Sequence, residues 1–174
     1  MEPYADNVVT FRVLLAGFEK ATHRFHDASL GQDAVAMFHP LFEALNWATA
    51  LDDQVGAHWA PAGSPLGWEW RRRVPEGRYV QAVRFARNRV HHQWADALNR
   101  TDGAVWPLRW PTAWQEWSWR ASADLPDGRD ERHRDVYDEV LGDQPARYAL
   151  DELSTAYRQL AERLEPQLAK SQDQ

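Results

Sequence analysis

The chain of 174 residues contains no cysteine, only two lysines and no long apolar run. The absence of cysteine excludes disulfides, thiolate metal sites and cysteine nucleophiles together. No apolar stretch approaches the roughly 20 residues that a membrane-spanning helix needs. The first residues are acidic rather than basic, and no apolar secretion-signal core follows them. We therefore expect a cytoplasmic protein that does not enter the membrane.

The composition is that of an ordinary globular domain, with 44% hydrophobic and 26% charged residues. A chain of this length buries roughly 70% of its unfolded surface when it folds as one unit. We predict a single domain over residues 1–174, with flexible ends at residues 1–7 and 170–174.

Charge is unevenly distributed along a chain whose formal net charge is −6. Seven arginines and one glutamate lie between Arg71 and Arg89, whereas thirteen acidic and seven basic residues follow from Asp124 onward. The basic segment can bind an external anion or the acidic half of its own chain, and the second outcome is the commoner one. Arginine in place of lysine suits planar, bidentate contacts to phosphate or carboxylate.

Hydrophobic periodicity predicts a mainly α fold, a helical bundle of about four to five helices. Apolar residues recur at i, i+3, i+4 and i+7, which is typical of helices with one buried face. The predicted helices cover residues 8–27, 32–55, 79–98, 131–141 and 145–168. The second is apolar on more than one face, which indicates a central position, and Pro40 predicts either a kink or a new start within it. Gly142 is expected to end the fourth helix.

Two segments interrupt the helical pattern. Residues 56–77 form a long loop rich in proline and glycine, and its role is open. Residues 104–128 contain a tryptophan-rich insertion, predicted to be a short β-hairpin or an extended arm. In it, Trp117 and Trp119 alternate with polar residues as in a half-buried strand. Such tryptophans can stack on nucleic-acid bases, but packing onto the core is the favoured interpretation.

Histidines on the first helix raise the question of a metal. His23 and His26 are spaced i, i+3 beside Asp27, so their imidazoles can approach one ion. A closed site needs more ligands than this helix offers. We therefore predict neither a metal site nor a cofactor.

The predicted helix over residues 79–98 carries the chemical groups that most resemble a site. Asn88, His92 and Asp96 are successive i, i+4 neighbours, so Asp96 can hold His92 in one tautomer. His91 is a second supporting residue, next to Arg87. The candidate phosphate-binding residues are Arg71, Arg72, Arg73, Arg84 and Arg89.

The six residues from Arg87 to His92 match the pattern Arg-Asn-x-x-x-His. This pattern resembles the motif of the HEPN superfamily, small helical-bundle proteins that include metal-independent endoribonucleases of toxin–antitoxin and antiphage systems. The resemblance covers these six residues and the helical setting. It implies that His92 acts as acid or base at the ribose 2′-hydroxyl, that Arg87 binds the scissile phosphate, and that Asn88 orients one of them. It also implies a homodimer in which two such helices meet at the site.

Helix geometry complicates that interpretation, because Arg87 and His92 lie about 140° apart around an ideal helix. Only the length of the arginine side chain, a kink, or a second copy can bring both to one phosphate. Two alternatives stay open. The chain can be a non-enzymatic module that binds a protein partner or a second copy through its tryptophan-rich surface. It can also bind RNA or another phosphate ligand without turnover.

Overall fold

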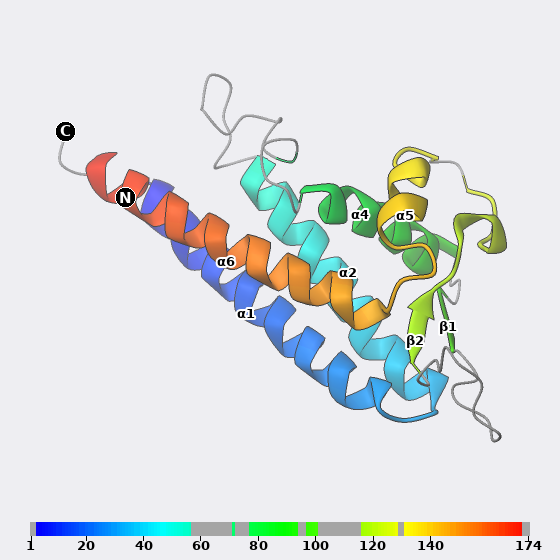
Figure 1. Cartoon of the computed structure of the whole chain (residues 1–174). Coiled ribbons are helices and arrows are strands. Elements are labelled where there is room, and N and C mark those ends of the chain that lie inside the picture. Colours follow the sequence, from blue (N-terminus) through cyan, green and yellow to red (C-terminus); the bar gives the residue numbers. More distant parts are fainter. Residues whose placement is uncertain are drawn as a thin grey trace, which may run out of the picture.

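The computed structural model describes residues 3–56, 71, 77–93, 97–100, 116–128 and 131–171. Within these residues the fold is mainly α, with five α-helices and one small antiparallel sheet (Figure 1). The helices are α1 (Pro3–Ser29), α2 (Ala34–Gln54), α4 (Gly77–Gln93), α5 (Arg134–Val140) and α6 (Ala146–Ser171). The predicted helical bundle is therefore confirmed.

The long helices α1 and α6 lie side by side in opposite directions, and α2 packs against both (Figure 1). On the other side of α2, α4 packs against α2 and α5. The core is aromatic: Phe18 of α1 is fully buried and meets the Tyr157 ring of α6 edge to face at 5.7 Å. Because α2 packs against α1, α4 and α6, it occupies the central position that its apolar pattern predicts.

The contact between α1 and α2 depends on one glycine. A Cβ atom at Gly17 would lie only 2.8 Å from Cε2 of Trp47, so the indole rests directly on the backbone of α1. At the start of α2, Asp33 accepts hydrogen bonds from the backbone nitrogens of Val35 and Ala36, a standard N-cap. Pro40 lies inside one continuous helix, so the helix does not begin again there.

The two strands are β1 (Leu98–Arg100) and β2 (Trp117–Trp119), with Leu98 paired to Trp119. The prediction that the third helix runs to Leu98 is wrong, because α4 ends at Gln93 and Leu98 begins a strand. The prediction of a half-buried strand is also wrong, since all three residues of β2 are buried. The far edge of β2 is covered by residues 143–145: the backbone nitrogen of Trp119 donates to Gln144, and its carbonyl accepts from Asp143, both at 2.9 Å.

The connection between α5 and α6 differs in detail from the prediction. The helix ends at Val140, and the left-handed residue that follows is Asp143, with φ of 60°, rather than Gly142. Gly142 is needed for another reason, because its ideal Cβ would lie 2.9 Å from the carbonyl oxygen of Asp138. In the described part of the chain, no helix combines the length and the apolar character needed to cross a membrane.

Candidate functional site

The structure places part of the predicted site on α4. Arg84, Arg87, Asn88, Arg89 and His91 belong to that helix, and Arg71 is described close to its start. His92 lies on the last turn of α4, but nothing is described of its side chain. Asp96, Arg72 and Arg73 lie outside the described residues.

Arg87 bridges α2 and α4. Its Nε donates to the amide oxygen of Asn46 at 3.3 Å, and a terminal nitrogen donates to the amide oxygen of Asn88 at 3.4 Å. Asn46 is itself anchored, because its Nδ2 donates to the carbonyl of Phe42 at 2.9 Å. The guanidinium therefore reaches from the α2 side of the helix toward Asn88. On an α-helix, Asn88 shares its side with the position of His92, one turn further on.

His91 faces α2 and packs there. Its imidazole stacks on the ring of Phe42, with centroids 5.1 Å apart and planes inclined by 11°. Phe42 thus contacts both halves of this region: its ring contacts His91, and its carbonyl holds Asn46. The supporting role predicted for His91 is compatible with such packing, which fixes the side of α4 that meets α2.

Arg89 is used within the fold. Arg89 is only 3% exposed, and its guanidinium carbon lies 4.5 Å from the centre of the Phe85 ring. The guanidinium donates a hydrogen bond to the Glu131 carboxylate at 2.7 Å. The hydrogen bond from Arg89 is the main reason why the pKa of the Glu131 carboxyl is lowered. A phosphate has little access to a guanidinium in this position, so its predicted phosphate-binding role gains no support from the geometry.

A buried carboxylate that the sequence did not single out organises the other side of α4. Asp52 of α2 is completely buried and accepts from Arg71 Nε at 2.6 Å and from Arg84. Arg84 also donates to the exposed Asp53 at 2.7 Å. We call these four residues the Asp52 cluster. Two arginines and two aspartates give it no net charge, which leaves little attraction for a phosphate.

The two aspartates of the cluster stabilise the charged form of Arg84. Burial alone lowers the pKa of Arg84, but the hydrogen bond to Asp53 and the charges of Asp52 and Asp53 raise that pKa above its usual value overall. Nearby, the hydroxyl of Tyr157 donates to the carbonyl of Ala48 at 2.8 Å. Burial first, and the charge of Asp52 second, raise the pKa of Tyr157 well above its usual value.

A sequence signal for the cluster existed. Leu41, Leu45 and Ala48 form a buried row on α2, and Asp52 continues that row at the next turn. A carboxylate in an apolar row needs a cationic partner once it is buried. The arginine-rich segment that follows offers several, but the sequence alone does not say which of them face α2.

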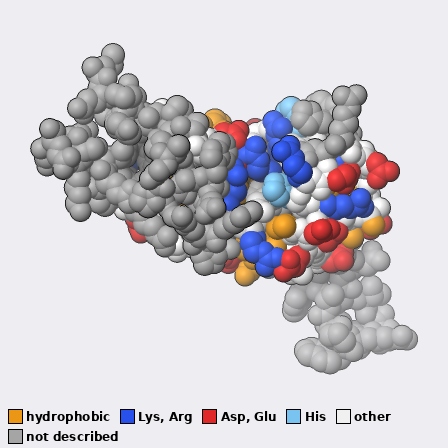
Figure 2. Space-filling model, turned by 90° about the horizontal axis from the view of Figure 1, so that it is seen from above, with side chains coloured by type: hydrophobic (Ala, Val, Ile, Leu, Met, Phe, Trp, Pro, Cys, Tyr) orange, Lys and Arg blue, Asp and Glu red, His pale blue; other side chains and the backbone are white. Residues whose placement is uncertain are grey.

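The basic segment also pairs with the acidic part of the chain. Arg78 forms an ion pair with Glu139 of α5, and Arg89 pairs with Glu131 just before α5. The interpretation that this segment binds the acidic half of its own chain is therefore confirmed for these two arginines. On the face seen in Figure 2, Lys and Arg side chains gather beside histidine, with Asp and Glu side chains close by.

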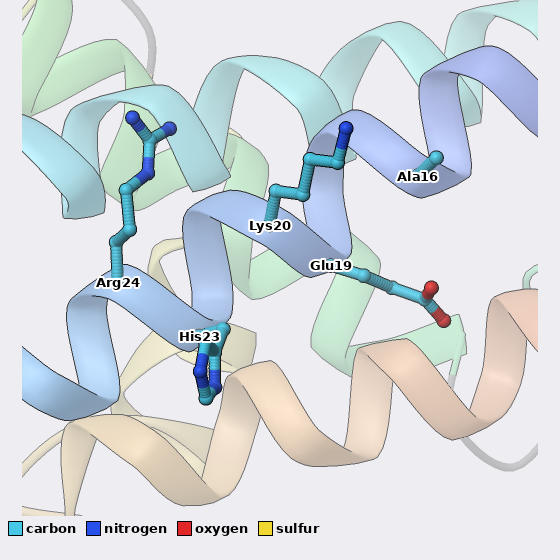
Figure 3. A pocket seen from close by; sticks show the side chains of 5 residues that line it. All are labelled: Ala16, Glu19, Lys20, His23 and Arg24. Atoms are coloured by element: carbon cyan, nitrogen blue, oxygen red, sulfur yellow. The ribbon is translucent and has the colours of Figure 1, made fainter.

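Two hollows lie away from Arg87 and Asn88. One of about 580 Å³ is lined by Ala16, Glu19, Lys20, His23 and Arg24 of α1 (Figure 3). The other, of about 380 Å³, is lined by residues from the starts of α4 and α6 and the end of α5. Among its lining residues, burial and a hydrogen bond with Tyr148 raise the pKa of Tyr79 to about 12. Within the described ranges, no group of three or more His, Asp or Glu residues is arranged to hold a metal ion.

The best-defined candidate site thus consists of Arg87 and Asn88 on α4 and Asn46 on α2, beside the helical position of His92. The arrangement offers a guanidinium oriented by two amides at the edge between two helices. Comparison of the chain with models of known protein families, with curated proteins and with solved structures gave no match.

Proposed function

We propose that the chain is a HEPN-like, metal-independent endoribonuclease of the toxin or antiphage type, in which His92 acts as acid or base and Arg87 binds the phosphate. One observation carries the proposal. The guanidinium of Arg87 extends from the α2 side of α4 to the amide of Asn88, 3.4 Å away. The guanidinium thereby contacts Asn88, which shares its side of the helix with the position of His92.

The chemistry suits these residue types. In RNA cleavage the ribose 2′-oxygen attacks the adjacent phosphorus, and the bond from phosphorus to the 5′-oxygen breaks. Histidine titrates close to neutral pH, so His92 can accept the 2′-hydroxyl proton or donate a proton to the leaving oxygen. The guanidinium of Arg87 offsets the negative charge that develops on the phosphate.

Two amide groups orient the guanidinium of Arg87, which supports its role as the phosphate ligand. Asn46 and Asn88 accept through neutral amide oxygens, which orient the guanidinium without cancelling its charge. Arg84 and Arg89 donate to carboxylates, so a phosphate would compete there with an acidic side chain.

The test is cleavage of a labelled single-stranded RNA in the presence of EDTA, with Arg87→Ala and His92→Ala. Loss of the acid–base group or of the phosphate ligand is expected to slow cleavage by about 100-fold or more. Arg78→Ala on the same helix and His23→Ala on α1 are matched controls, and both should retain the wild-type rate. Cleavage that survives both site substitutions refutes the proposal.

The same experiment distinguishes the alternatives. A phosphate binder without turnover retains RNA, shows a steep salt dependence and forms no product. A protein-binding module shows no RNA affinity at low salt. For the tryptophan-rich surface, Trp117 and Trp119 are buried in the core, so these two indoles are not available to a partner.

A further inference from the structure

The edge between α2 and α4 has a defined register. Phe42 of α2 lies opposite His91 of α4, and one turn further along α2 Asn46 lies opposite Arg87. Four residues forward on α2 thus correspond to four residues back on α4, so the two helices run antiparallel along this edge. The two contacts therefore show which positions of the two helices lie at the same level.

His39 lies on this edge, about one turn before Phe42. It is exposed, and its ring meets the ring of Phe38 edge to face at 6.1 Å. The Phe38 ring stacks in turn on Phe42, with centroids 6.1 Å apart. The His39 side chain forms no hydrogen bond or ion pair with any residue that the structure describes. An aromatic row therefore supports this imidazole, and within the described chain neither of its ring nitrogens has a partner.

The side of α2 that carries His39 also carries Asn46. Seven residues separate the two, and at 100° per residue their positions differ by only about 20° around the helix. On α4, Asn88 shares its side with the position of His92, one turn further on. The guanidinium of Arg87 contacts both asparagines. These two sides of α2 and α4 therefore border the same edge, with the guanidinium between them.

The register brings the positions of the two histidines to nearly the same level. His39 precedes Phe42 by three residues, so its level on α4 lies three residues beyond His91 and two beyond His92. Two residues correspond to about 3 Å along a helix axis. From Arg87, both positions lie in the same direction, toward the end of α4. The positions of His39 and His92 therefore border the same stretch of the edge, one on each helix.

We propose that His39 is the second acid–base residue of the candidate site and shares the two proton transfers of RNA cleavage with His92, an inference that rests on the proposed function. One imidazole accepts the proton of the 2′-hydroxyl while the 2′-oxygen forms its bond to phosphorus. The other, as imidazolium, donates its proton to the 5′-oxygen while the bond from phosphorus to that oxygen breaks. The products are a 2′,3′-cyclic phosphate and a 5′-hydroxyl, and proton exchange with water restores both imidazoles.

The reaction needs two groups because the two protons move at different oxygens. The attacking and the leaving oxygen lie on opposite sides of phosphorus in an in-line displacement. One group must start neutral and the other protonated, and histidine can take either form near neutral pH. The motif at residues 87–92 supplies one such histidine from α4. His39 supplies another from α2, so that one chain holds both groups.

Charged and titratable groups near His39 come from the helices packed around it. Glu43 lies one turn further along α2 and is paired with Arg24 of α1, and Arg87 reaches the edge from α4. Helix α6 packs on the inner side of α2, where Tyr157 is buried. Because Glu43 already has a cationic partner, a bound phosphate is the anion that stabilises the imidazolium form of His39 during cleavage.

The pH dependence of cleavage of a labelled RNA, measured in EDTA, tests the proposal. The wild-type chain should give a bell-shaped profile of kcat/KM, since one imidazole must be neutral and the other charged. His39→Ala should lower kcat about 100-fold, leave KM nearly unchanged and remove one limb of the bell. His23→Ala replaces another exposed histidine and is the matched control. It should keep the wild-type rate and both limbs.

An RNA with sulfur in place of the bridging 5′-oxygen identifies the group that donates the proton. A thiolate leaves without being protonated, so the variant that lacks the acid should regain a rate close to wild type on this substrate. The variant that lacks the base should stay slow. We expect rescue of either His39→Ala or His92→Ala, but not of both. Rescue of both variants or of neither overturns the division of roles.

The outcomes distinguish this inference from the proposed function. If Arg87→Ala and His92→Ala stop cleavage while His39→Ala keeps the wild-type rate and both limbs, the nuclease function stands and the role of His39 is refuted. If the wild-type chain does not cleave RNA, the proposed function fails and the role of His39 fails with it. Thermal unfolding of His39→Ala should match wild type, because the side chain is exposed. A matching curve excludes loss of the fold as the cause of a slower rate.

Discussion

Replacing Asp52 by asparagine is the most direct test of the interior described above. Asp52 has no exposed surface and holds Arg71 and Arg84, whose side chains are 17% and 32% exposed. Asparagine keeps the shape but removes the charge, so the two guanidiniums lose their shared carboxylate. Removing one member of a buried ion pair costs about 3–5 kcal/mol. Because both arginines retain some contact with water, and Arg84 keeps Asp53, we expect the lower end, about 3 kcal/mol.

The assay is equilibrium unfolding in urea at pH 7, followed by tryptophan fluorescence. For a chain of this size, a loss of about 3 kcal/mol corresponds to a decrease of about 6–12 °C in Tm. Asp53→Asn is the matched control, because Asp53 is the next residue and also accepts from Arg84, but its side chain is 61% exposed. Its effect should stay below about 1 kcal/mol. Equal small losses from the two substitutions would show that Asp52 is not a buried, shared acceptor.

Three further predictions follow from single contacts. Gly17→Ala should lower the free energy of unfolding by about 1–2 kcal/mol despite the better helix propensity of alanine, because the new methyl group meets the indole of Trp47. Adding Trp47→Leu should relieve part of this loss, and thermal unfolding of the two variants measures both effects. Burial raises the pKa of Tyr137 and Tyr157, so the folded chain keeps these protons longer and its stability should fall above pH ~10, by about 1.4 kcal/mol per pH unit for each tyrosine. Absorbance at 295 nm should show that these tyrosines ionise at higher pH in the folded chain than in the chain unfolded by urea. Asn46→Ala should lower kcat for RNA cleavage about tenfold and affect KM less, because the Asn46 amide orients the guanidinium of Arg87.

The helices were predictable because each depends on a local pattern. The central helix was expected over residues 32–55 and spans Ala34–Gln54, where Asp33 supplies the cap. The strand at Leu98–Arg100 was not predictable in the same way, because three residues carry no period. Its strand character comes from pairing with β2, which lies far along the chain. The burial of β2 likewise depends on the segment after α5 that covers its edge.

The candidate site was predictable only in part. The pattern at residues 87–92 could be read directly, but the acceptor of Arg87 on α2 requires the alignment of two helices. The same is true of Asp52, whose place in an apolar row was visible while its partners Arg71 and Arg84 were not. A sequence shows how many charges a segment carries. It does not show which of them are neutralised by the fold.

That distinction leads to a measurable salt dependence. Four arginines between residues 71 and 89 bind carboxylates: Arg71, Arg78, Arg84 and Arg89. An arginine already paired with a carboxylate gains little from a phosphate and releases few counterions when RNA binds. For single-stranded RNA, each true phosphate contact contributes about −0.7 to the slope of log K against log salt. We expect Arg87→Ala to reduce the magnitude of that slope by about 0.7, and Arg78→Ala to leave it unchanged. Equal reductions by both would mean that RNA opens these ion pairs, and that the whole basic segment, rather than Arg87, meets the phosphates.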